Sequence, residues 1–198
     1  MLLVSFNNFM KKYFKYVMAM LVLVLPVISF AADFRSGEQI SIGKNEKVTN
    51  DVYMAGGSVN SIGNIIGDLI IAGGNIIISG DVSQDINAGG GNINILSNVG
   101  DDVRVGGGTV VIQGKIGGDL IVGGGQVNVG GDGISGDVVI GGGNVRIDAL
   151  VAGKLSVYGG NVYINAPIGG DVKIEAEKIT LGSNAVINGN LTYKSNQE

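Results

Sequence analysis

The sequence predicts an all-β fold: a single-stranded parallel β-helix (a solenoid) of about eight turns with 17 residues each. Three observations predict it: an internal repeat, aliphatic residues confined to fixed columns of that repeat, and glycines grouped between those columns. The repeats open, in order, with Asp51, Asp68, Asp85, Asp102, Asp119, Asp137, Lys154 and Asp171. Successive openings lie 17 residues apart, except for one spacing of 18 before Asp137. Columns are numbered here from the opening residue.

Five columns, numbers 2, 4, 9, 11 and 15, are aliphatic in nearly every repeat. Of these 40 positions, 39 are apolar and only Ser61 is polar. Columns 2 and 4, like columns 9 and 11, alternate with polar neighbours and are mostly β-branched, which is typical of strands. We therefore expect two alternating strands and a third short one around column 15 in each turn. Their inward side chains should form one dry aliphatic stack.

Glycines fill columns 6 and 7 in most repeats, between the two expected strands. Because glycine adopts positive φ angles freely, the expectation is a sharp corner at this place. Three corners close one turn of the solenoid, and successive turns stack as parallel strands about 4.8 Å apart. Eight such turns make a rod of roughly 40 Å. The triple glycines at 106–108, 123–125 and 141–143 resemble nucleotide-binding loops only superficially, because they open no helix and recur in successive turns.

The first 31 residues have the features of a signal peptide. Three lysines precede the apolar run 16–28, and small residues at Ser29 and Ala31 favour cleavage after Ala31. An uncleaved anchor is the alternative, although the run is shorter than a spanning helix needs. The expected organisation is a signal peptide (1–31), an N-terminal partial cap (32–50), the β-helix (51–193) and a polar tail (194–198). Such a protein would be exported to the periplasm, cell surface or medium.

Composition limits the possible functions. The 198 residues contain no His and no Cys, which removes imidazole acid–base catalysis, thiolate nucleophiles and disulfides. The net charge is −4, and loss of the three leader lysines makes it −7. An acidic chain without a basic cluster argues against nucleic acid and anionic lipid as partners. We expect no catalytic, cofactor-binding or metal-binding residues, no cofactor, and no strong membrane insertion after leader removal.

The aspartates that open the repeats form column 1, and this column can be interpreted in two ways. Stacked carboxylates could chelate divalent cations, or each could accept backbone N–H bonds at its corner, as in an Asx turn. Lys154 interrupts the file and favours the second interpretation, and repulsion between neighbours is only about 1 kcal/mol in water. The closest acid pairs are Asp101 with Asp102 and Asp81 with Asp85. They would be the candidates if the protein were a carboxylate-based polysaccharide-cleaving enzyme, but repeats of nearly constant length leave no loop to shape a cleft.

Column 8 is a polar file in which stacked amides should hydrogen-bond along the axis, as in cross-β ladders. It holds Ser58, Asn75, Asn92, Thr109, Gln126, Asn144, Asn161 and Lys178. Column 3 points outward and is partly apolar, so neighbouring Ile121 and Val139 could form a small lateral contact. These columns are first of all structural.

Three strings carry a family resemblance: GGDLIVGGGQVNV (117–129), GDVVIGGGNVRI (136–147) and GGDVKIEAEKITLGSNAVINGNLTY (169–193). They resemble the bactofilin-like, polymer-forming cytoskeletal proteins, in the exported glycine-rich subgroup, over about residues 51–193. The resemblance implies a right-handed β-helix and end-to-end assembly into filaments without nucleotide. It implies no catalytic residue.

The expected function is a non-catalytic structural or scaffolding protein of the bacterial cell envelope. It would associate with itself through the ends of the β-helix, where strand edges are open to pairing. The alternative is a surface binding module or adhesin that uses an outer face for cell-envelope glycan or protein. Outward residues that would serve it are Tyr53, Arg104, Arg146 and Tyr163.

Overall fold

The computed structural model describes residues 32–195. The expected signal peptide (1–31) and the last three residues of the expected polar tail lie outside the described residues. The described part is all-β and contains no helix long and apolar enough to cross a membrane.

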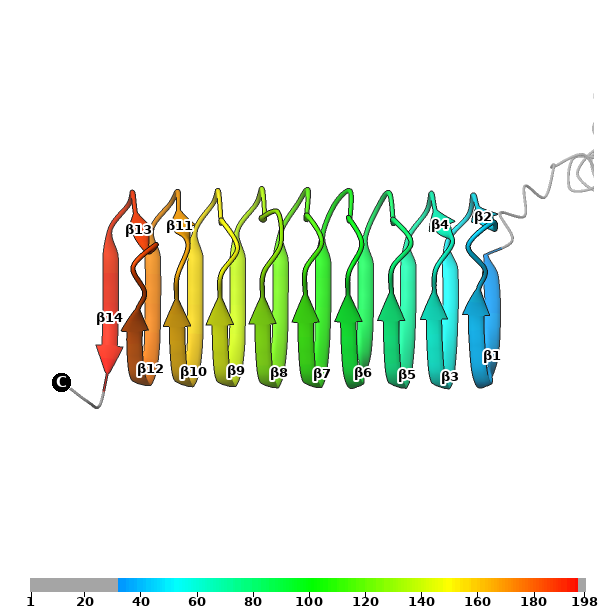
Figure 1. The fold of residues 1–198 in the computed structure, drawn as a ribbon, viewed down its shortest axis with the longest axis horizontal. Coiled ribbons are helices and arrows are strands. Elements are labelled where there is room, and N and C mark those ends of the chain that lie inside the picture. Colours follow the sequence, from blue (N-terminus) through cyan, green and yellow to red (C-terminus); the bar gives the residue numbers. More distant parts are fainter. Residues whose placement is uncertain (1–31, 196–198) are drawn as a thin grey trace, which may run out of the picture. The chain divides into compact units, whose positions relative to one another are not determined.

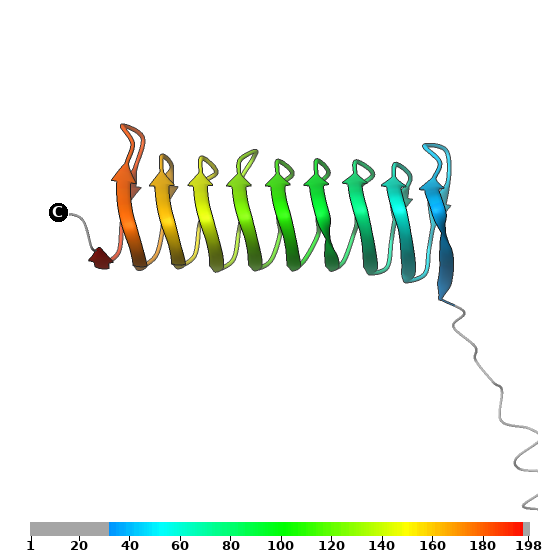
Figure 2. The same cartoon turned by 90° about the horizontal axis from the view of Figure 1, so that it is seen from below.

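Ten strands stack in parallel along one axis to form the wall of a solenoid of about ten turns (Figure 1). The long strands are β1 (Asp33–Ile42), β3 (Val52–Ser61), β5 (Leu69–Ile78), β6 (Ile86–Ile95), β7 (Val103–Ile112), β8 (Leu120–Val129), β9 (Val138–Ile147), β10 (Leu155–Ile164), β12 (Val172–Leu181) and β14 (Leu191–Ser195). They are neighbours in that order. Viewed from below, the turns follow one another along a single axis (Figure 2).

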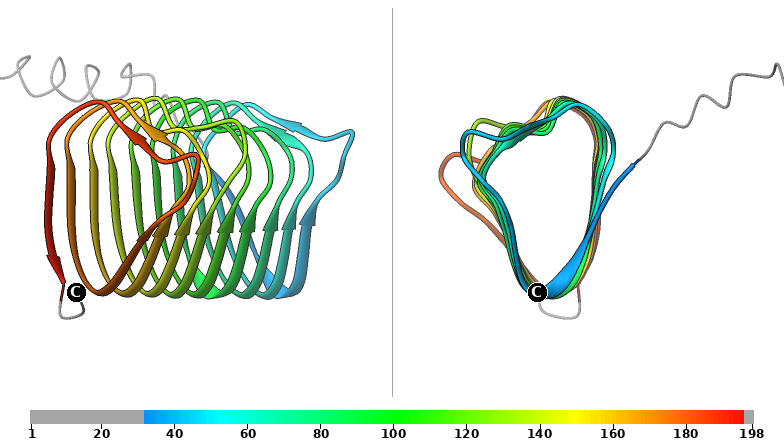
Figure 3. Two further views of the ribbon diagram at one scale, coloured as in Figure 1. Left: turned by 60° about the vertical axis from the view of Figure 1, so that its left-hand side comes forward. Right: turned by 90° about the vertical axis from the view of Figure 1, so that its right-hand side faces the viewer.

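Each turn also pairs with its neighbours at a second place, through strands of only two residues or single β-bridges. These short strands are β2 (Lys47–Val48), β4 (Asn64–Ile65), β11 (Pro167–Ile168) and β13 (Val186–Ile187), and single bridges such as Val82 to Val99 continue the pairing between them. Along the axis the turns superimpose as one closed outline with a narrow corner (Figure 3). The predicted single-stranded parallel β-helix is confirmed.

The two expected alternating strands are one continuous strand of ten residues that bends at the glycines. Strand β5 shows this: Leu69 and Ile71 are buried before the bend, and Ile76 and Ile78 after it. The expectation that the paired glycines need positive φ was wrong. Among the described glycines, only Gly131 and Gly133, in the one repeat with an extra residue, have positive φ.

Close approach of the stacked backbones explains the glycines of column 6, which only the last full turn replaces, with Ala176. A Cβ at Gly90, in column 6, would lie 2.3 Å from the carbonyl oxygen of Gly73 on the preceding turn. A Cβ at Gly89, in column 5, would have no atom within 4 Å. Column 5 accordingly also accepts larger residues, such as Tyr158 and Glu175, at the same register.

The core is the aliphatic stack that the five columns predict. Residues such as Val52, Leu120 and Ile164 are fully buried and belong to one cluster that runs through the solenoid. The exceptions lie mainly in the last complete turn, where Leu181 and Val186 are about half exposed because no full turn covers them.

The structure has about two turns more than the eight repeats predict. Residues 33–42, within the expected partial cap, form the full-length strand β1, which pairs in register with β3 from Asp33–Val52 to Ile42–Ser61. At the other end, β14 adds half a turn and continues to Ser195, inside the expected polar tail. The solenoid therefore fills nearly the whole described chain.

Candidate functional site

The file of aspartates is a ladder of hydrogen bonds between turns. Asp119 Oδ1 accepts the backbone N–H of Asp137 at 2.8 Å, and Asp137 Oδ1 accepts that of Lys154 at 2.8 Å. The same bond recurs from Asp51, Asp68, Asp85 and Asp102 to the opening residue of the next turn. The interpretation as backbone acceptors is confirmed, but the bond joins consecutive turns instead of closing a local Asx turn.

A second ladder of the same kind lies in column 14 and was missed from the sequence. Asn64 Oδ1 accepts the N–H of Asp81 at 3.1 Å, and Asp81 Oδ1 accepts that of Asn98 at 3.0 Å. Asn98 continues the ladder to Lys115. The signal was available, because Asn64, Asp81 and Asn98 are spaced by 17 residues and precede the apolar residue of column 15.

One carboxylate cluster fits the geometry of a cation site. Oxygens of Asp85, Asp101 and Asp102 lie within 4.8 Å of one another, so Asp85 joins the predicted pair Asp101–Asp102. Asp81, which was predicted to pair with Asp85, is not in this cluster and belongs to the column 14 ladder. Arg104 already supplies positive charge there, with ion pairs to Asp102 at 2.8 Å and Asp85 at 3.3 Å. The neighbouring Asp102 carboxylate raises the pKa of Asp101 above its ordinary value. Because Asp85 and Asp102 are each bound to Arg104 and to a backbone N–H, the cluster is organised by the protein's own groups.

The amide ladder expected in column 8 forms at two places. Asn92 Nδ2 donates to Asn75 Oδ1 at 2.9 Å, and Asn161 Nδ2 donates to Asn144 Oδ1 at 2.9 Å. Both bonds run along the solenoid axis, from one turn to the next. The expected amide ladder is therefore present at these two steps and not along the whole of column 8.

The outward residues named for a binding function lie in three separate places. Tyr53 stacks on Phe34 at the first turns, with ring centroids 4.7 Å apart. Arg104 belongs to the aspartate cluster, whereas the Arg146 guanidinium lies 4.5 Å from the centre of the Tyr163 ring. Ile121 and Val139, the expected lateral contact, are indeed neighbours by register and stay exposed.

The N-terminal end of the core is covered by charged groups. Asp33 and Arg35 pair in register with Val52 and Met54, so they occupy the inward columns 2 and 4 of the first turn. Arg35 forms ion pairs with Asp33 at 2.6 Å and with Glu46. Its hydrogen bonds lower the pKa of both carboxyl groups below their ordinary values. Inward-pointing charges at a terminal strand oppose pairing with another chain.

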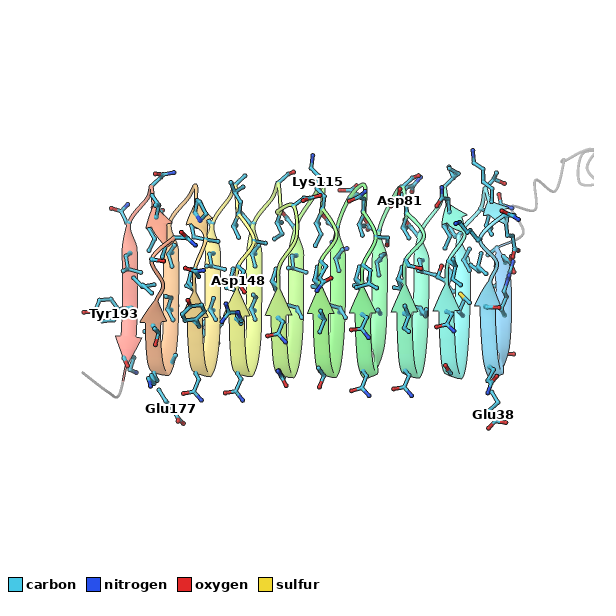
Figure 4. All side chains as sticks on the ribbon, viewed as in Figure 1. Glu38, Asp81, Lys115, Asp148, Glu177 and Tyr193 are labelled. Carbon is cyan, nitrogen blue, oxygen red and sulfur yellow. The ribbon has the colours of Figure 1, made fainter. Side chains whose placement is uncertain are left out.

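The C-terminal end is apolar by contrast. Strand β14 pairs only with Val172–Ala176 of β12, and no described strand covers the second half of β12. Val186 is 52% exposed and Tyr193 66%, and Leu181 and Leu191 are also exposed at this end. Figure 4 shows Tyr193 at the end of the rod opposite Glu38. The two ends of the solenoid therefore differ in chemistry.

Comparisons with protein-family models, curated proteins and solved structures found no match to this chain.

Proposed function

We propose that this chain is a non-catalytic structural protein of the bacterial cell envelope, related to the bactofilin-like family, that associates with itself through the C-terminal end of its β-helix. The observation that carries the proposal is the exposed apolar end made by Leu181, Val186, Leu191 and Tyr193, which we call the C-terminal apolar end. Exposed apolar groups beside an open strand edge favour pairing with another chain.

A second copy is the occupant that best fits this end. The open edge of β14 and the uncovered half of β12 have no strand partner among the described residues, and they lie beside the exposed apolar side chains of this end. Two such ends related by a two-fold axis would bury identical patches against each other. The charged Asp33–Arg35–Glu46 cluster disfavours the N-terminal end as the partner surface. Two C-terminal ends in contact give a closed pair of chains, and the longer filaments that the family resemblance implies would also need contacts between N-terminal ends.

The absence of catalysis is proposed from the chemistry of the residues. The sequence contains no His and no Cys. Asp85 and Asp102, the best placed of the predicted acids, each use one oxygen for a backbone N–H and the other for Arg104. About half of the acceptor capacity of each carboxylate is thus used by the protein itself, which makes both less available as general bases.

Sedimentation of two matched variants tests the proposal. Leu191→Lys places a charge in the C-terminal apolar end, and Ile121→Lys places the same charge on the side of the rod at a residue of similar exposure. The purified protein should sediment as a pair of chains at high concentration. Leu191→Lys should shift it to single chains, and Ile121→Lys should leave it unchanged. A wild-type protein that stays a single chain, or equal effects of the two variants, would refute the proposal.

A further inference from the structure

A side of the solenoid free of carboxylates is formed by columns 8 and 10. These columns alternate with the buried columns 9 and 11, so their side chains point outward. We call the residues in them the amide surface: Gln39, Ser41, Ser58, Asn60, Asn75, Ile77, Asn92, Asn94, Thr109, Val111, Gln126, Asn128, Asn144, Arg146, Asn161, Tyr163, Lys178 and Thr180. Its columns follow the solenoid axis, along the strand halves that carry the arrowheads in Figure 1.

The charge of this surface is opposite to that of the rest of the protein. The chain has 17 acidic residues, yet the amide surface contains none of them. Nine of its members are Asn or Gln, and its only charged members are Arg146 and Lys178. These two cations lie within two turns of each other, near the C-terminal part of the surface. Arg146 is paired with Asp148 of column 12, so Lys178 carries the positive charge that no described carboxylate neutralises.

A depression of about 360 Å³ lies at that place, over strands β8 to β12. Asn144 and Asn161 line one part of it, Arg146 and Tyr163 another, and Lys178 also contributes. Two contacts fix its aromatic part. Arg146 donates to both oxygens of Asp148, at 2.5 and 2.9 Å, and its guanidinium lies over the Tyr163 ring.

Hydrogen-bonding capacity remains in the depression after the protein's own bonds are made. The Asn161–Asn144 bond uses one N–H of Asn161 and the carbonyl of Asn144. It leaves the Asn144 amide donors and the Asn161 carbonyl acceptor without a protein partner among the described residues. Amides offer donors and acceptors side by side, and sugar hydroxyl groups need both. Lys178, which is also in column 8, adds a cation to the depression.

We infer that this depression binds a linear acidic polysaccharide, lying along the axis with its hydroxyl groups on the amides and a carboxylate near Lys178. The other classes of partner fit less well. Nucleic acid requires many cations to neutralise its phosphates, and the surface has two. A protein partner requires buried apolar anchors, but Ile77 and Val111 lie outside the depression. This inference goes beyond self-association, because the amide surface runs along the side of the rod and adjoins the C-terminal apolar end only at β12, where Lys178 and Thr180 lie next to Leu181.

Calorimetric titration of the purified full chain tests the inference. The acidic probes are hexagalacturonate, an alginate hexasaccharide and a hyaluronan hexasaccharide, and cellohexaose is the neutral probe. Lys178→Gln and Tyr163→Ala should each weaken binding of an acidic probe about tenfold, the effect of losing one good contact. Asn144→Asp should weaken it at least as much, because it places a carboxylate in the depression.

The matched controls are Lys173→Gln and Tyr158→Ala. Like Lys178 and Tyr163, these residues lie on β12 and β10, but outside the amide surface, with Lys173 Nζ 5.4 Å from the centre of the Tyr158 ring. The controls should bind like the wild type, and all five variants should keep its unfolding midpoint. No binding of any acidic probe, equally tight binding of cellohexaose, or equal losses in the controls would overturn the inference.

Discussion

Asp119 Oδ1 accepts the backbone N–H of Asp137, the residue that opens the next turn, at 2.8 Å. This contact explains why an acid recurs at the start of each repeat: it satisfies a backbone donor that would otherwise rely on water at the corner. An amide oxygen could accept the same bond, which is what Asn64 and Asn98 do in the second ladder. The charge is therefore not essential to the ladder.

Two substitutions of Asp119 separate its role as an acceptor from its charge. Asp119→Ala removes the acceptor and should lower the free energy of unfolding by about 1 kcal/mol. Asp119→Asn keeps an acceptor at the same place and should cost much less. Urea denaturation measures both, and equal losses would contradict the ladder as its function.

Adjacent glycines should differ sharply in their tolerance of a methyl group. Gly90→Ala should destabilise the protein by about 2 kcal/mol or more, because its Cβ would collide with the carbonyl of Gly73. Gly89→Ala should be neutral or slightly stabilising, since its Cβ meets no atom and alanine reduces the entropy of the unfolded chain. Thermal unfolding of the two variants tests this directly. Similar losses in both would mean that backbone approach does not explain the glycines of column 6.

Much of this fold could be predicted because the same pattern of aliphatic residues and glycines recurs in each repeat. The aliphatic columns identify the core residue by residue, as Leu69, Ile71, Ile76 and Ile78 illustrate. The bend was predicted at the right place for the wrong reason, because the distance between Gly90 and the previous turn depends on stacking and leaves no trace in the local sequence.

The ends were the least predictable part. Asp33 and Arg35 stand in columns that are apolar elsewhere, so the pattern of the repeat fails in the first turn although the backbone continues. The first turn differs because no described strand covers its outer side, and the charged groups there form ion pairs. The contrast between the two ends could be recognised only in the structure. The amide surface, by comparison, can be predicted from columns 8 and 10 once the register is known.

Ser61 is the one polar residue in the predicted core columns, and replacing it with an apolar residue should stabilise the protein. It is fully buried between Ile42 and Ile78 in the stack, and its hydroxyl has no hydrogen-bond partner. Ser61→Val should raise the free energy of unfolding by about 1 to 2 kcal/mol, because it removes an unsatisfied buried polar group and adds apolar contact. Ser61→Ala should give a smaller gain. A lower urea midpoint for both variants would show that the hydroxyl contributes favourably.

The charged cluster at the N-terminal end predicts a specific dependence on pH. Hydrogen bonds from Arg35 lower the pKa of Asp33 and Glu46, so these carboxylates stabilise the fold above their unfolded pKa values. That contribution is lost as the pH falls through the lowered values. Arg35→Met should therefore be less stable than the wild type near neutral pH, and the difference should close as the pH falls below the lowered pKa values of the two carboxyl groups. Urea midpoints at several pH values provide the measurement, and a difference that stays constant would exclude the cluster as its cause.

The mass and length of the particle in solution test the central claim most directly. Small-angle X-ray scattering over a range of concentrations should show single rods of roughly 45 Å that combine into pairs about twice as long, with unchanged cross-section. Such growth along the axis alone is what association through C-terminal ends predicts. Particles with the mass of one chain at every concentration, or pairs that grow in cross-section instead of length, would contradict it.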